Sequence, residues 1–357
     1  MTVEYGQWSD MHFFPRLAAR ARLIHTMAAV AVVAALALFA APATAQVASP
    51  PTAAVTWRMA TEYPQSNISG IGIVTFAKLV SERTDGLVVV APAFDNELKV
   101  TSSEMPRAAR EGRIEAGDAF AGPLSGLDPV FGLSTLPFVV QSIEAAREMN
   151  GRARPLYEKA LAAQGLKLLY LTIWPATGLW SERALSDRED LATLSLRTYD
   201  QSSTDIMRAA GASAEFLPMD KALAALKEHR LNAFLTSGDG GSGRKLWDFL
   251  PHFTAINYAI PVSIAFVRSE IFAALSAEMQ QKVLAAASET ERSQLDLLAN
   301  RTAENYARMR ANGVTIVEPA PASLLAALRQ AAERPIAEWK LRAGDGAADI
   351  VASAIRQ

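Results

Sequence analysis

Short apolar runs alternate with amphipathic segments along most of the chain from Val55 onward. Apolar runs predict strands at residues 55–60, 87–91, 114–120 and 166–173, and apolar positions spaced three and four apart predict helices at 69–83, 103–111 and 141–164. The same order returns later, with strands expected at 194–198, 214–217 and 231–236 and helices at 202–210 and 219–230. Strands that alternate with helices in this way predict α/β sheets covered by helices on both faces.

The segment from Ser276 to Asn312 departs from this pattern, since it contains neither glycine nor proline. Ser276 suits a helix N-cap, and Asn312-Gly313 suits a helix end. The segment therefore predicts one long helix or a kinked pair. A single small domain cannot cover so long a helix, so we expect it to brace two lobes. A strand at 314–317 and helices at 320–339 and 347–355 complete the chain.

The N-terminal region has the organisation of a secretory signal peptide. Arg16, Arg20 and Arg22 precede an uncharged apolar run at residues 27–40, and Ala43-x-Ala45 follows as a cleavage site. A membrane anchor is the alternative, but a span needs about 20 apolar residues, more than this run provides. We expect a signal peptide at 1–45, cleaved near Ala45, and a mobile tether at 46–54. The mature chain is then exported and not inserted in the membrane.

The composition excludes several kinds of function. The 357 residues include no cysteine and four histidines, and the formal net charge is -2. The missing cysteine excludes disulfides, thiolate nucleophiles and cysteine-ligated metals. Cleavage of the signal peptide leaves only His229 and His252, which excludes a histidine-rich metal site. The near-neutral charge gives no footprint for nucleic acid. We expect no metal and no cofactor.

The segment Gly238-Asp-Gly-Gly-Ser-Gly243 has the spacing of a dinucleotide-binding loop, G-x-G-x-x-G. In that fold the loop follows the first strand, with an acidic residue about 20 positions later, whereas here it lies late in the chain and an apolar region follows. As a phosphate-binding loop it has Arg244 where a lysine belongs. We interpret the segment as a strand-to-helix turn whose amides face a cleft.

Neither remaining histidine has a catalytic setting. His229 stands between Glu228 and Arg230 at a predicted helix end, where the helix dipole accounts for it, and His252 after Pro251 predicts a turn. No G-x-S-x-G elbow is present. We therefore predict no catalytic residues and no enzyme activity.

Arg197 is the strongest candidate for binding. It ends the apolar strand Leu194-Ser-Leu-Arg197, and the carboxyl ends of strands in α/β sheets face the crevice where ligands bind. Its planar guanidinium matches a carboxylate with two parallel hydrogen bonds. The alternative is a structural ion pair with a local acid such as Asp200.

Two tryptophans surround a Pro/Gly turn in Trp174-Pro-Ala-Thr-Gly-Leu-Trp180. They could pack together at a hinge, or they could wall an apolar pocket, because ligand pockets are lined by aromatic side chains with a few polar groups. Trp174 is the better candidate for a pocket wall, since it follows the strand end at Ile173.

The order of several motifs resembles the solute-binding receptors of tripartite ATP-independent periplasmic (TRAP) transporters. The resemblance extends from about Thr56 to Ala287. The motifs that carry it are Ala60-Thr-Glu-Tyr-Pro64, Phe76-Ala-Lys-Leu-Val80, Asp128-Pro-Val-Phe-Gly-Leu with Leu136-Pro-Phe138, Leu194-Ser-Leu-Arg197 and Leu246-Trp-Asp248.

The resemblance implies an α/β fold of the bilobal periplasmic-binding-protein type, with two mixed sheets flanked by helices and joined by hinge strands and the long bracing helix. Lobe I would comprise residues 55–174 and about 263–290, and lobe II residues 175–262 and about 291–357. The lobes would close on a small organic acid, Arg197 matching the family's carboxylate-binding arginine. The acid would pass to integral-membrane carrier subunits without ATP. We expect a periplasmic monomer.

The chain departs from many family members at two places. Gly178-Leu179-Trp180 stands where many have a second arginine, and Asn232-Ala-Phe-Leu-Thr-Ser237 replaces an Asp-Gly-Gln-Glu-Asn run. Both changes remove partners for charged and hydroxylated ligands, which favours a monocarboxylate with an apolar or aromatic body over sialic acid or a C4-dicarboxylate. The expected ligand-binding residues are Arg197, Trp174, Tyr63, Glu62, Phe120, Gly178, Tyr199, Thr236, Ser237 and Asp239. An exported α/β enzyme acting on a small carboxylate and a sensory receptor stay open as alternatives.

Overall fold

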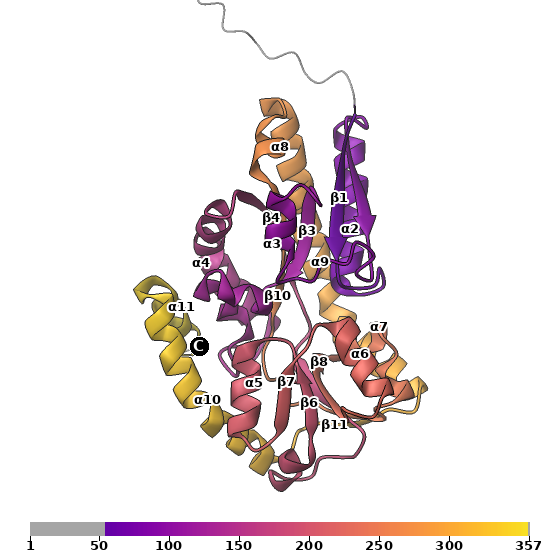
Figure 1. Cartoon of the computed structure of the whole chain (residues 1–357), viewed down its shortest axis with the longest axis vertical. Coiled ribbons are helices and arrows are strands. Elements are labelled where there is room, and N and C mark those ends of the chain that lie inside the picture. The colour runs from indigo at the N-terminus through magenta and orange to yellow at the C-terminus, as the bar shows by residue number, and fades with distance from the viewer. Residues whose placement is uncertain (1–53, 356–357) are drawn as a thin grey trace, which may run out of the picture. The chain divides into compact units, whose positions relative to one another are not determined.

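The computed structural model describes residues 54–355. It has two mixed β-sheets with helices around them (Figure 1). The first sheet, sheet A, has the strand order β2-β1-β3-β10-β4, and the second, sheet B, has the order β11-β9-β5-β8-β6-β7. The α/β class with two mixed sheets is thus confirmed. The predicted signal peptide and residues 46–53 of the tether lie outside the described residues.

Sheet A brings one end of each of its five strands to the same edge. Strand β1 (Val55–Thr61) pairs in parallel with β2 (Val88–Ala93) and β3 (Ala116–Phe120). Strand β10 (Val262–Arg268) lies antiparallel between β3 and β4 (Leu166–Ile173), with Ser263 opposite Phe120 and Val262 opposite Ile173. The carboxyl ends of β1, β3 and β4 therefore lie together, beside the start of β10.

Sheet B has the same arrangement around its central strands. Strand β6 (Ser195–Thr198) pairs in parallel with β7 (Ser213–Phe216) and β8 (Ala233–Ser237). Strand β5 (Thr177–Ser181) is antiparallel to both β8 and β9 (His252–Thr254), and β11 (Thr315–Val317) is parallel to β9. The carboxyl ends of β6 and β8 thus lie at one edge, where Thr177 faces Ser237.

The helices begin near the predicted positions because local caps are present. The side chains of Ser142, Asp200 and Ser276 each accept a hydrogen bond from the backbone N–H three residues later. The helices are α2 (Ile68–Arg83), α3 (Met105–Arg110), α4 (Ile143–Ala162), α5 (Gln201–Ala209), α6 (Met219–Lys227), α7 (Gly238–Gly243), α8 (Ser269–Ala273), α9 (Ala277–Ala311), α10 (Ala322–Ala343) and α11 (Asp345–Ile355). Four short 3₁₀ turns lie at Gly122–Gly126, Pro129–Thr135, Glu189–Thr193 and Leu246–Asp248.

Helix α9 packs against both sheets. It is a single helix of 35 residues, so of the two forms predicted for this segment the unbroken one is present. Val283 and Ala286 in its first half belong to a buried cluster with Trp57 and Phe76 of sheet A and α2. Met309 near its end belongs to the cluster that Phe234 and Phe253 of sheet B form. One rigid element therefore buries apolar surface in both lobes.

Helices α10 and α11 connect the two halves a second time. Leu324 and Leu328 of α10 are buried with residues of sheet B, whereas Trp339 near its end and Val351 of α11 are buried in the cluster around α4. The Trp339 indole donates a hydrogen bond of 2.8 Å to the Pro129 carbonyl. The lobe limits drawn from the sequence stay a prediction.

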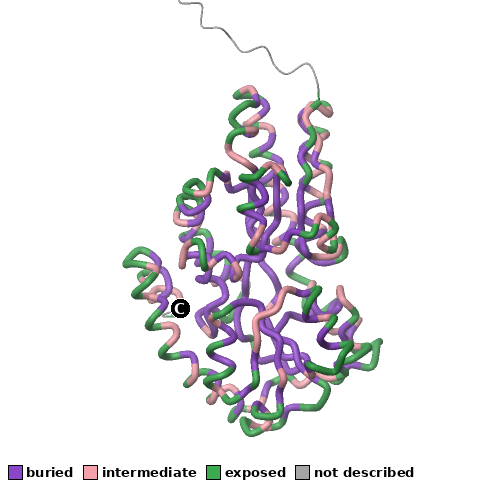
Figure 2. The backbone as a smooth tube through the Cα atoms, viewed as in Figure 1, coloured by how far each residue is buried: buried purple, intermediate pink, exposed green. Residues whose placement is uncertain are grey.

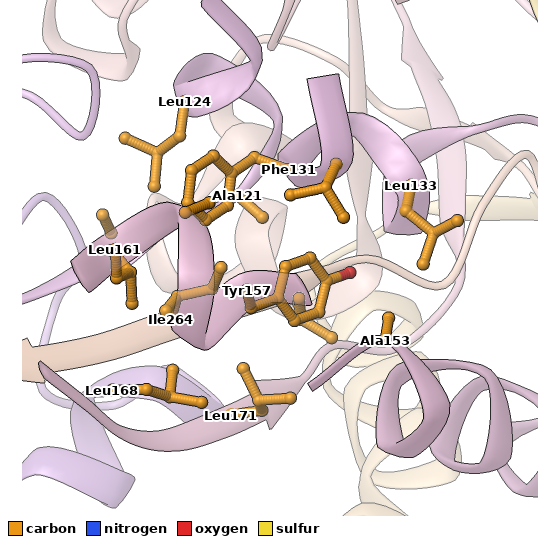
Figure 3. Close-up of a cluster of buried hydrophobic side chains, with 14 of the residues drawn as sticks. Ala121, Leu124, Phe131, Leu133, Ala153, Tyr157, Leu161, Leu168, Leu171 and Ile264 are labelled. Carbon is orange, nitrogen blue, oxygen red and sulfur yellow. The ribbon is translucent and has the colours of Figure 1, made fainter. Parts of the chain in front are cut away.

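The largest buried cluster lies where α4 covers sheet A (Figure 3). The rings of Phe131 and Tyr157 stack with 6.0 Å between their centroids, beside Leu161 and Ile264. The Tyr157 hydroxyl donates a hydrogen bond of 2.9 Å to Asn150, so the ring is buried without an unpaired polar atom. Buried positions follow the strands of both sheets, while the outer helix faces are exposed (Figure 2).

Two expectations from the sequence are wrong, since the Pro/Gly turn after Trp174 contains β5, and His252 opens β9 instead of lying in a turn. The glycine-rich segment does follow a strand directly, but it forms the short helix α7 itself. The antiparallel strand β10 was not predicted. The glycines of α7 permit close packing, because a Cβ on Gly241 would overlap the indole ring of Trp180. The G-x-G-x-x-G spacing therefore reflects helix packing.

Substitution of Gly241 by alanine tests this explanation. We expect the Gly241→Ala variant to lose about 1–3 kcal/mol of unfolding free energy, because the added methyl group overpacks a filled interior. Gly346→Ala is the matched control, since a Cβ there meets nothing within 4 Å, and an alanine in a helix does not destabilise. Urea unfolding measures both variants. A Gly241→Ala variant as stable as the parent would contradict the packing argument.

Candidate functional site

A buried cavity lies where the strand ends of the two sheets meet. Two adjoining spaces, each with a cavity volume of about 20 Å³, share Tyr63, Phe120, Arg197, Tyr199 and Met219 in their walls, so we treat them as one, the site cavity. Glu62, Ser102 and Pro218 line one end, and Trp174, Thr236 and Ser237 line the other. The position agrees with the general rule that α/β sheets bind ligands beyond the carboxyl ends of their strands.

Strand ends position most of the predicted site residues. Glu62 and Tyr63 follow β1, and Phe120 ends β3. Trp174 follows β4, and Arg197 and Tyr199 lie at the end of β6. Thr236 and Ser237 end β8, so eight of the ten residues predicted from the sequence lie in the cavity wall.

Arg197 is a buried cation held by backbone carbonyls. It is 6% exposed, and its Nε and Nη1 donate hydrogen bonds of 2.9 Å to Leu217 O and 3.5 Å to Leu235 O. Within residues 54–355 no acid forms an ion pair with it, and its Nη2 makes no hydrogen bond. The alternative pairing with Asp200 is wrong, because the Asp200 carboxylate caps α5 and accepts from Ser203 N at 2.7 Å.

Burial lowers the pKa of Arg197 below its usual value, while the nearby Tyr63 and Glu62 act in the opposite direction. A guanidinium stays protonated at any physiological pH. A buried charge without a counter-ion is unfavourable by several kcal/mol. The arrangement around Arg197 therefore fits an anion, and a carboxylate in particular.

Four aromatic rings enclose the space beside Arg197. The Tyr63 and Trp174 ring centroids are 4.6 Å apart, and Phe120 meets Tyr199 edge to face at 5.2 Å. The Trp174 indole donates a hydrogen bond of 2.9 Å to Ser263, which fixes its orientation. These rings form apolar walls beside the charge.

The two tryptophans of the Pro/Gly segment have different roles. Trp174 lines the site cavity, as favoured from the sequence. Trp180 is fully buried in the core of sheet B, where its ring meets Phe253 edge to face at 5.4 Å. Trp174 therefore lies in the cavity wall, whereas Trp180 packs within the core of sheet B.

Hydroxyl groups lie at the end of the cavity beside Trp174. Thr177, Thr236 and Ser237 line it together. Ser237 Oγ accepts a hydrogen bond of 3.1 Å from Gly240 N as the N-cap of α7, and its proton is still available to donate. Thr177 was not predicted, because its segment was interpreted as a turn.

Gly178 and Asp239 do not line the cavity, which corrects two predicted site residues. Gly178 lies in β5 opposite Thr236, and a Cβ there would overlap the Phe253 ring, so its role is close packing. The Asp239 carboxylate has 0% exposure and accepts from Arg301 Nε at 2.6 Å and from Ile68 N at 2.9 Å. Asp239 thus ties α7 to the start of α2 and to α9.

Met219, Pro218 and Pro261 also line the cavity but were not predicted. Pro218 and Met219 lie at the start of α6, and Pro261 directly precedes β10. The sequence offers one signal for the first two, since Pro218-Met219 opens a predicted helix directly after a strand.

The described part of the chain offers no group of three histidine, aspartate or glutamate side chains suited to a metal ion. None of its helices is both long and apolar enough to span a membrane. Two lobes with a buried cationic and aromatic cavity between their strand ends define a receptor for a small ligand.

Comparison with known proteins places the chain in a family. The model of DctP, the bacterial extracellular solute-binding proteins of family 7, matches residues 59–340, so the chain belongs to this family of solute receptors. The resemblance to TRAP receptors seen in the motifs is thereby confirmed. The family is one of solute-binding proteins and not of enzymes.

Similar structures share the fold over nearly the whole described chain. DctP6 of Bordetella pertussis, an extracytoplasmic solute receptor that binds pyroglutamic acid, is 24% identical, with a TM-score of 0.80 over 85% of this chain and 100% of that one. A TRAP solute-binding protein of Xanthobacter autotrophicus with bound galacturonate is 14% identical, with a TM-score of 0.77 over 84% and 99%. In amino-acid sequence, a Haemophilus influenzae protein is 22% identical to this chain over 76% of this chain and 84% of its own length.

Loss of the buried ion pair between Asp239 and Arg301 should have a large effect on stability. We expect Asp239→Asn to lower the unfolding free energy by about 3 kcal/mol or more, because it leaves the Arg301 charge without its buried partner. Glu228→Gln is the control, since the pair of Glu228 with Arg230 is exposed on both sides and is worth about 1 kcal/mol at most. Urea unfolding compares them. Equal losses in the two variants would contradict the structural role of Asp239.

Asp118 lies behind the cavity wall in β3, two residues before Phe120. Burial raises the pKa of its carboxyl from 3.8 to about 6, and hydrogen bonds from Ser69 and Ser263 only partly oppose this. The folded state thus binds the proton more tightly than the unfolded state does. The resulting stabilisation is complete below about pH 4 and is lost as the pH rises through about 6.

Between pH 4 and pH 7, the unfolding free energy of the parent protein should therefore fall by about 3 kcal/mol relative to that of Asp118→Asn, at 1.36 kcal/mol per pKa unit. Urea unfolding of both proteins across this range gives the difference between their unfolding free energies, in which the contributions of the other titrating groups cancel. A difference independent of pH would show that folding does not raise the pKa of Asp118.

Proposed function

We propose that this protein captures a small monocarboxylic acid in the site cavity and delivers it to a TRAP-type membrane carrier for uptake. The observation that carries the proposal is the Arg197 guanidinium, buried in the cavity wall without an acidic partner among residues 54–355. A ligand carboxylate would satisfy its free Nη2 with a charge-assisted hydrogen bond.

The aromatic walls support a compact body for the acid. Tyr63, Phe120, Trp174 and Tyr199 offer ring faces and edges. Among residues 54–355, Arg197 is the one cation in the cavity wall, so a single carboxylate is favoured over two. DctP6 binds pyroglutamic acid, a cyclic monocarboxylate of this kind. L-Pyroglutamate is therefore the first ligand to test.

The site of action in this proposal is the periplasm. The N-terminal pattern of residues 1–45 supports export with cleavage near Ala45, and the absence of cysteine supports a protein free of lipid anchor and disulfide. The receptor would act as a monomer, bind the acid by closure of the lobes and release it unchanged to integral-membrane carrier subunits.

A thermal-shift screen over monocarboxylates, dicarboxylates and neutral sugars tests the ligand class. A ligand that binds only the folded protein raises its melting temperature, by an amount that grows with concentration. We expect L-pyroglutamate or a related compact monocarboxylate to give a shift. Shifts from dicarboxylates or neutral sugars alone would contradict the proposal.

Substitution of Arg197 tests the binding group. We expect Arg197→Ala to weaken binding of the acid at least about tenfold, because an unpaired buried carboxylate costs about 2–5 kcal/mol and 1.4 kcal/mol is a factor of ten. Arg188→Ala, on an exposed arginine paired with Glu189, should leave the affinity unchanged. Titration calorimetry measures both. Full affinity in a folded Arg197→Ala variant would overturn the role of Arg197.

A further inference from the structure

A second charged side chain lies in the site cavity, and the capture of a carboxylate does not explain it. Glu62 follows β1, is 8% exposed and lines the cavity beside Thr101, Ser102 and Ser103. The nearby arginines have other partners, since Arg244 pairs with Asp95 and Arg301 with Asp239. Within residues 54–355, Glu62 thus forms no ion pair.

Local contacts fix Glu62 in place. Its Oε2 accepts a hydrogen bond of 2.6 Å from Ser102 N, and its backbone carbonyl accepts one from Arg244 Nη2. Arg197 is fixed equally well on the other sheet by Leu217 O. Burial raises the pKa of the Glu62 carboxyl, and the hydrogen bond from Ser102 and the charge of Arg197 oppose this. No hydrogen bond joins Glu62 to Arg197 among the described residues. They therefore present one fixed cation and one fixed acceptor to the same cavity.

The chemistry of a carboxylate limits what can lie against it. An ionised carboxylate only accepts hydrogen bonds, and burial against an apolar group leaves it without a partner. A second ligand carboxylate would meet like charge, which is also unfavourable. An N–H or O–H group of the ligand is the partner that removes both penalties.

We propose that Glu62 is the specificity-determining residue of the cavity: it accepts a hydrogen bond from an N–H or O–H group of the bound acid and so selects monocarboxylates that carry such a donor. The inference rests on the proposed function, which places the ligand carboxylate at Arg197. It adds that the ligand carries a hydrogen-bond donor on the part of the molecule that faces Glu62.

A pair of isosteric acids tests the inference on the parent protein. L-Pyroglutamate carries a lactam N–H, and 5-oxotetrahydrofuran-2-carboxylate of the same configuration has a ring oxygen at that position with the ring carbonyl and carboxylate retained. We expect the lactam to bind at least about tenfold more tightly in titration calorimetry, because the lactone leaves Glu62 facing an acceptor. Equal affinities would overturn the inference while leaving the proposed function intact.

The Glu62→Gln variant links the discrimination to this side chain. A glutamine can keep the Ser102 hydrogen bond with its carbonyl oxygen and then turns an NH₂ donor toward the ligand. The ratio of lactam to lactone affinity should fall to about threefold or less. Glu97→Gln, the same change on an exposed residue outside the cavity, should leave the ratio unchanged. An unaltered ratio in a folded Glu62→Gln variant would overturn the inference, and binding of neither acid by the parent would overturn the proposed function with it.

Discussion

A buried arginine charge without a protein counter-ion among residues 54–355 limits what the site cavity can bind. Arg197 is held in β6 by backbone carbonyls, which orient the guanidinium but do not neutralise it. Because Arg197 is buried, an anion that enters the cavity interacts more strongly with it than it would in water. The negative charge of a bound ligand would thus supply the counter-ion of Arg197.

The rest of the fold keeps this group and its surroundings in place. Sheet A supplies Glu62, Tyr63 and Phe120, and sheet B supplies Arg197 and Tyr199, so the cavity exists only when the two sheets face each other. Helix α9 and the α10–α11 pair bury apolar surface against both halves. Direct polar contacts add to this, since Arg244 of the sheet B half binds Glu62 O and Asp95 of the sheet A half.

Much of the fold and most of the site could be predicted from the sequence, because both depend on local pattern. Apolar runs located the parallel strands, and the residues after them, such as Arg197 and Trp174, lie at the cavity because parallel strands share an edge. The absence of glycine and proline predicted α9. These signals lie within a few residues of the feature they predict.

The failures concern features that depend on distant parts of the chain. Asp239 has the local context of a cleft residue, but α9 returns some sixty positions later and brings Arg301 to its carboxylate. Gly178 and Gly241 are explained by Phe253 and Trp180, which only the folded sheet B brings against them. Strands β5 and β9 are short and follow prolines, so their pairing partners and not their own sequences define them.

The most direct test of the account compares an acid with its own amide. L-Pyroglutamate and L-pyroglutamide have nearly the same shape, and only the first carries the negative charge that Arg197 requires. Titration calorimetry on the parent protein should show binding of the acid and at least about tenfold weaker binding of the amide, a difference of 1.4 kcal/mol or more. Equal affinity for both would contradict the claim that an unpaired buried arginine defines this site.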